Sequence, residues 1–123
     1  MLFRSRLVTA CDSVAGFLNS AVNRVERRQQ PIELIISLKE NRLTMYSNQP
    51  GFTRELTMPD GIANEAVLPA VQEEPEDGRR LILMPGATGP GIGIQIANRR
   101  GGRRIVRLDP MTGFPRVESV IPQ

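Results

Sequence analysis

The first part of the chain has the apolar spacing of an amphipathic helix. From residue 3 to residue 25, apolar side chains recur at intervals of three and four, and polar side chains fill the positions between them. Pro31 disfavours helical geometry at the residue before it, so we expect the helix to end near residues 28–30. The predicted packing face consists of Phe3, Leu7, Cys11, Val14, Leu18, Val22 and Val25.

After Pro31 the apolar period changes from that of a helix to that of a strand. Alternating or β-branched runs follow one another, separated by turn residues such as Pro59-Asp60-Gly61. Connections of hairpin length between successive strands favour antiparallel pairing. The predicted strands cover residues 32–38, 42–47, 52–58, 62–68, 80–84, 92–98, 103–108 and 116–120.

These two periods together predict an α+β fold. A long amphipathic helix in residues 1–30 is expected to pack on one face of an antiparallel β-sheet domain formed by residues 31–123. We expect that domain to hold two small sheets with seven or eight short strands. A chain of 123 residues has the length of one domain, and no second domain is predicted.

Composition adds that the protein is globular and has few aromatic side chains. Apolar residues make up 40% of the chain and charged residues 24%, which excludes a disordered polypeptide. Aromatic residues make up only 4%, so the core must be built from Ile, Leu, Val, Met and Ala. No apolar run approaches the roughly 20 residues that are needed to span a bilayer.

The chemistry of the side chains argues against an enzyme. The chain has no histidine, so it lacks the commonest general base and the commonest transition-metal ligand, and no Ser-His-Asp triad can form within it. Its single cysteine, Cys11, cannot form an internal disulfide, and its place on the apolar stripe favours a buried hydrophobic role over a reactive thiol. We predict no catalytic residue, no cofactor and no small-molecule substrate.

An acidic segment separates two basic parts of the chain. Residues 69–79 combine prolines with a run of carboxylates formed by Glu73, Glu74, Glu76 and Asp77. Carboxylate oxygens can bind Ca²⁺, but the run lacks the alternating spacing and the central glycine of an EF-hand loop. We therefore predict a solvated surface loop and no metal site, although the sequence leaves a metal in this loop open.

The most suggestive charged feature is a group of arginines around a predicted hairpin. With four guanidinium groups expected near one tip, the hairpin is a candidate contact for phosphates or for a protein partner. No aromatic residues are interleaved for base stacking, so contact with an acidic surface of a neighbouring subunit, or exposure to solvent without a partner, is favoured over nucleic acid. The candidate residues are Arg99, Arg100, Arg103, Arg104 and Arg107.

Three segments carry a resemblance to a known family. Residues 17–31 are the polar, Arg-rich end of a helix that runs directly into a strand at residues 32–34. Residues 83–88 have the sequence Leu-Met-Pro-Gly-Ala-Thr, and residues 105–117 form a strand, a turn and the start of another strand. The order and content of these segments resemble the GspH/FimT family of minor pseudopilins and minor pilins over nearly the whole chain.

The resemblance implies a structural role in a filament. Residues 1–30 would be the C-terminal half of a pilin-type helix, whose missing N-terminal half would anchor the full-length protein in the bacterial inner membrane. This chain would lie in the periplasm and contribute to the assembly or tip of a type II secretion pseudopilus. Its partners would be other pseudopilins, whose helices would cover a half-exposed apolar stripe.

The FimT branch implies an alternative, because some of its members bind DNA for uptake through a C-terminal Gly-Arg-x-Arg motif. This chain has Gly113-Phe114-Pro115-Arg116 at the corresponding place. Phe114 stands where the first arginine of the motif would be, which favours secretion over DNA uptake. The arginines of the predicted hairpin keep DNA binding as the alternative.

Overall fold

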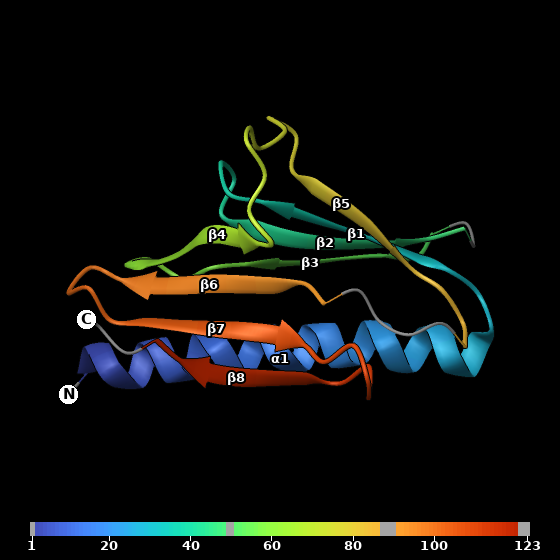
Figure 1. Cartoon of the computed structure of the whole chain (residues 1–123), viewed down its shortest axis with the longest axis horizontal. Coiled ribbons are helices and arrows are strands. Elements are labelled where there is room, and N and C mark those ends of the chain that lie inside the picture. The colour runs from blue at the N-terminus through green and yellow to red at the C-terminus, as the bar shows by residue number, and fades with distance from the viewer. Residues whose placement is uncertain (1, 49–50, 87–90, 121–123) are drawn as a thin grey trace.

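The protein is an α+β domain with one N-terminal helix and two antiparallel sheets of four strands each (Figure 1). The computed structural model describes the backbone of residues 2–48, 51–86 and 91–120, and the side chains from Arg6 onward. Helix α1 covers Leu2–Arg28. The strands are β1 (Ile32–Ser37), β2 (Arg42–Ser47), β3 (Thr53–Thr57), β4 (Ile62–Leu68), β5 (Arg79–Leu83), β6 (Gly93–Asn98), β7 (Arg103–Leu108) and β8 (Pro115–Ser119).

The chain crosses between the two sheets more than once. The first sheet has the order β3-β2-β1-β5 and the second has the order β4-β6-β7-β8. After three strands of the first sheet, β4 begins the second sheet, β5 returns to the first beside β1, and β6 re-enters the second beside β4. The chain therefore passes between the two sheets three times, after β3, after β4 and after β5.

Helix α1 lies along the second sheet, chiefly against β7 and β8 (Figure 1). It also contacts β4, β5 and β6. Within the described residues no helix is both long enough and apolar enough to cross a membrane.

One hydrophobic core joins the helix to both sheets. Leu18 on α1, Leu34 on β1, Ile94 on β6 and Val106 on β7 are each at most 1% exposed and belong to the same cluster. Burying a side chain of this size contributes about 1.5–3 kcal/mol relative to leaving it in water. Buried positions alternate with exposed or half-buried ones in β4 and over the first five residues of β1, as expected for sheets that are covered on one face.

The predicted elements are confirmed with small shifts at their ends. The helix ends at Arg28, where Gln29 adopts a left-handed conformation with φ of 53°, two residues before Pro31. All eight predicted strands are present, and their bounds differ from the prediction by at most one residue. The side chain of Phe3, and residues 87 and 88 of the loop used for the resemblance, lie outside the described residues.

The expectation of a half-exposed apolar stripe on the helix is wrong for most of its length. Val22 is half-buried, but the other described members of the stripe are buried within the chain itself. The reason is that the two sheets offer enough apolar surface to cover the stripe, so partner helices are not needed for it. The buried members are Leu7, Cys11, Val14, Leu18 and Val25.

Candidate functional site

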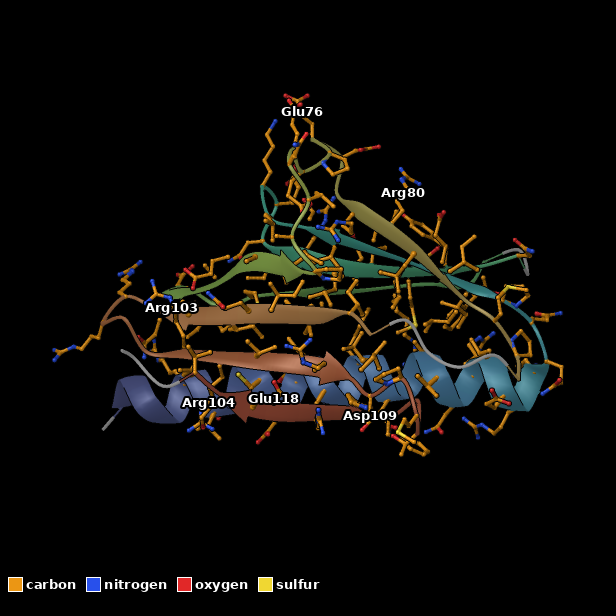
Figure 2. The ribbon with its side chains drawn as sticks, in the orientation of Figure 1. Glu76, Arg80, Arg103, Arg104, Asp109 and Glu118 are labelled. Atoms are coloured by element: carbon orange, nitrogen blue, oxygen red, sulfur yellow. The ribbon has the colours of Figure 1, made fainter. Side chains whose placement is uncertain are left out.

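The arginines of the β6–β7 hairpin do not form one patch. Successive side chains of a strand point to opposite faces, so Arg103 and Arg107 share one face of β7. Arg104 lies on the other face, towards the helix (Figure 2). Only Arg99 and Arg100 lie in the turn itself. The expected group of four guanidinium groups at one tip is therefore wrong, because the alternation of the strand separates its members.

Two of these arginines form ion pairs with carboxylates on other strands of the second sheet. The Nε atom of Arg103 donates to Oε1 of Glu65 on β4 at 2.6 Å, and the Nε atom of Arg107 donates to Oε1 of Glu118 on β8 at 3.3 Å. These ion pairs lie across the outer face of the second sheet. Their positive charges are balanced within the chain, which leaves less net charge there for an anionic partner.

Two arginines of β5 form ion pairs with carboxylates of the acidic loop. Arg79 forms a two-point ion pair with Glu74, and its Nη1 atom donates to the carbonyl oxygen of Pro69 at 3.0 Å. Arg80 lies 3.1 Å from Asp77 and 3.4 Å from Glu33. Among the described residues, no three or more acidic, histidine or cysteine side chains are grouped so that they could hold a metal ion. The structure therefore assigns these carboxylates to local ion pairs.

Cys11 is 1% exposed on the face of α1 that packs on the second sheet. Burial raises the pKa of its thiol to about 11, an effect that Arg104 opposes and Asp12 reinforces. A thiol that stays protonated and out of contact with solvent is a poor nucleophile. The expected role as a small buried hydrophobic side chain is confirmed.

An apolar groove of about 500 Å³ lies beside the C-terminal end of α1, where sequence reasoning placed no site. Its floor includes the buried side chains of Val25, Leu83 and Leu108. Its rim carries large apolar side chains that stay in water although they are next to the core. We call this the Phe114 groove; its exposed rim residues are Ile82 (58%), Met84 (50%), Met111 (90%) and Phe114 (52%).

The Phe114 groove brings together segments that are distant in the chain. Residues 82–84 cover the end of the edge strand β5 and the residue after it, and residues 110–114 lie in the β7–β8 turn. The helix contributes Val22, Asn23, Val25 and Glu26. A signal for it was present in the sequence, since Met111 and Phe114 are large apolar residues within a predicted turn, where polar residues are usual. Only the tertiary structure shows that Met111 and Phe114 line the same groove as Ile82 and Met84.

Comparison with protein-family models, with curated proteins and with solved structures gives no match to this chain. Function must therefore be argued from the fold and its surfaces. The described surfaces offer an apolar groove and balanced ion pairs, while the thiol is buried. These surface features are suited to contact with a partner.

Proposed function

We propose that the chain is the periplasmic part of a GspH-like minor pseudopilin, a non-enzymatic structural subunit of a type II secretion pseudopilus. Support comes from the resemblance of residues 17–34, 83–88 and 105–117 to that family. It also comes from the arrangement of one N-terminal helix packed on two antiparallel sheets. In the full-length protein an additional N-terminal segment would anchor the helix in the inner membrane.

The observation that carries the proposal is the Phe114 groove. Contiguous exposed apolar side chains on a protein surface mark contact sites, and aromatic and methionine side chains are enriched in the centres of such contacts. Phe114 is 52% exposed and Met111 is 90% exposed, so both have apolar surface left to bury. Burial of each against another pseudopilin would contribute on the order of 1–2 kcal/mol.

The position of the groove suits a subunit of a filament. It lies at the end of α1 that is farther from the proposed membrane anchor, and it includes the helix residues Asn23 and Glu26. A partner seated there contacts the helix and the β domain of this chain at the same time. Since the buried stripe of α1 is covered by the chain's own sheets, we place the partner contact in this groove and on the exposed polar face of the helix.

The test is binding of the neighbouring pseudopilins to the wild type and to groove variants. We expect the double variant Met111→Ser, Phe114→Ser to bind a partner pseudopilin about tenfold or more weakly, with an unchanged melting temperature. The matched control is Val71→Ser, because Val71 is 47% exposed but lies in the acidic loop. Equal affinity for all three proteins would overturn the assignment of the groove.

The second candidate is a FimT-like minor pilin that binds DNA. The observation in its favour is that Arg99 and Arg100 are exposed at the tip of the β6–β7 turn. Against it stand Phe114 in place of an arginine and the ion pairs of Arg103 and Arg107 with carboxylates. Gel-shift assays at several salt concentrations with Arg99→Ser, Arg100→Ser separate the two functions, since only DNA binding predicts a salt-dependent shift that this variant weakens.

A further inference from the structure

A small pocket lies on another side of α1, where the helix meets the first sheet. Its volume is about 140 Å³. It shares Asn23 with the Phe114 groove, but all its other lining residues are different and most of them are polar. The helix presents polar side chains to it at positions spaced by three and four residues, so that they share one face. We call it the arginine pocket; it is lined by Ser20, Asn23, Arg24, Arg27, Met45, Phe52 and Arg54.

Phe52 organises two of the guanidinium groups in the arginine pocket. The guanidinium carbon of Arg24 lies 3.5 Å from the centre of the Phe52 ring, and that of Arg54 lies 5.7 Å from it. The ring itself packs against the hydrophobic core, which fixes its position. Cation–π contacts of this kind restrict long side chains, so the loss of side-chain freedom on binding a ligand is smaller.

Positive charge is concentrated at this point. The pKa of Arg24 is lowered, first by desolvation of its guanidinium and then by the repulsion of Arg28, Arg54 and Arg27. The described lining residues of the pocket include three arginines and no carboxylate. An anion placed among these arginines is attracted by each of their positive charges.

The hydrogen-bonding groups point to the same kind of ligand. Guanidinium groups have only donors, and the Ser20 hydroxyl and the Asn23 amide can each supply another donor. The last turn of a helix favours cations, which accounts for Arg27 and Arg28. It does not account for Arg54, which comes from β3 in the first sheet and still lines the pocket.

We propose that the arginine pocket binds a phosphate oxyanion, either free phosphate or the terminal phosphate group of a larger molecule. The pocket is smaller than the roughly 300 Å³ at which sites for drug-sized ligands begin, so it holds one tetrahedral group and leaves any attached part in solvent. Arg24, Arg27 and Arg54 supply charge-assisted hydrogen bonds, and Ser20 and Asn23 supply neutral ones. No bond is made or broken in the pocket.

Calorimetric titration with inorganic phosphate tests the proposal on the wild type and two variants. Arg54→Gln removes one guanidinium group from the pocket, and Arg99→Gln removes the same charge at the exposed β6–β7 turn, outside it. We expect saturable binding by the wild type, binding about tenfold weaker in Arg54→Gln, and near wild-type binding in Arg99→Gln. Absence of saturable binding, or equal weakening in both variants, would overturn the proposal.

A second measurement guards against a folding defect and separates the two sources of phosphate. Phosphate should raise the melting temperature of the wild type and of Arg99→Gln more than that of Arg54→Gln. Titration with a short oligonucleotide, with and without a 5′-phosphate, forms the second arm. Tighter binding of the 5′-phosphorylated form than of inorganic phosphate, lost in Arg54→Gln, identifies a terminal phosphate as the ligand, whereas weaker binding identifies free phosphate.

Discussion

The Oδ1 atom of Asn41 accepts a hydrogen bond of 2.9 Å from the backbone N–H of Asn64, and this contact links the two sheets. The Nδ2 atom of Asn41 donates in turn to the carbonyl oxygen of Ile62 at 2.8 Å. Asn64 is 1% exposed, and its Nδ2 atom donates to the carbonyl oxygen of Ser37 at 3.2 Å. The β1–β2 turn is thereby joined to β4 through side-chain amides at the point where the chain changes sheets.

Removal of the Asn41 side chain should lower the free energy of unfolding more than a substitution in a turn usually does. Two hydrogen bonds of about 1 kcal/mol each are lost. Asn41 also has a φ of 56°, and alanine in this left-handed region adds a further 1 kcal/mol or so that glycine avoids. We expect losses of about 3 kcal/mol for Asn41→Ala and about 2 kcal/mol for Asn41→Gly in urea unfolding. Asn48→Ala, at an exposed position directly after β2, should change stability by less than about 0.5 kcal/mol. Equal effects at the two positions would contradict the sheet-linking role of Asn41.

The helix stripe should be indispensable for the stability of the isolated domain. Leu18 is 1% exposed in the core, so Leu18→Ala leaves a cavity and should lower the free energy of unfolding by about 2–5 kcal/mol. Val8 lies on the same helix but is 36% exposed, and Val8→Ala should lower it by less than about 1 kcal/mol. Thermal and urea unfolding followed by circular dichroism measure both. A small loss in Leu18→Ala would show that the stripe is covered only in a larger assembly.

Because the thiol of Cys11 ionises more readily in the unfolded chain, the free energy of unfolding should fall as the pH rises above 9. Below pH 9.0 the thiol is protonated in both the folded and the unfolded chain. Between pH 9.0 and about 11 the unfolded chain loses this proton while the folded chain keeps it, so rising pH favours unfolding, by on the order of 2 kcal/mol over that range.

The variant Cys11→Ala isolates this effect. The substitution itself should cost about 1 kcal/mol at neutral pH, because it removes a buried sulfur atom. The advantage of the wild type in unfolding free energy should then shrink above pH 9 and reverse before pH 11, where Cys11→Ala becomes the more stable protein. A difference that stays constant over that range would show that the thiol ionises alike in both states. Labelling of Cys11 by a thiol reagent at pH 8 should likewise proceed only as fast as the chain opens.

The ion pair between Glu74 and Arg79 should hold the acidic loop against β5. The side chain of Arg79 is only 14% exposed, so Glu74→Gln leaves a partly buried guanidinium group without its carboxylate. We expect a loss of about 1–2 kcal/mol and faster cleavage within residues 69–78 by an added protease. Glu73→Gln removes the adjacent, exposed charge and should change neither quantity. Equal cleavage rates in the two variants would rule out a clamping role for the pair.

Secondary structure could be predicted here because its signals are local. The change of apolar period at Pro31, and turn residues such as Pro59-Asp60-Gly61, act over a few neighbouring residues. The elements they predicted match α1 and all eight strands. Neither the pairing of β5 with β1 nor that of β4 with β6 follows from such signals, because each strand skips its neighbours in the sequence.

The surfaces were harder to predict than the elements, because charges meet across strands. Arg103 and Arg107 were candidate contacts, and each proved to face a carboxylate from another strand, Glu65 and Glu118. The Phe114 groove and the arginine pocket could not be predicted either, because each depends on contacts between distant segments. Each is assembled from the helix and from strands or turns that are 18 or more residues away along the chain.

The amino-acid sequence by itself determined the α+β class, the length of the helix, the number of strands and the role of Cys11 as a buried side chain. Periodicity and turn chemistry are properties of neighbouring residues, so they can be read before the chain folds. Only the tertiary structure decided the sheet order, the covering of the helix stripe and the pairing of Arg103 and Arg107 with carboxylates. It also decided the positions of the Phe114 groove and the arginine pocket. These depend on which distant segments come into contact, and that is settled by the packing of the whole core.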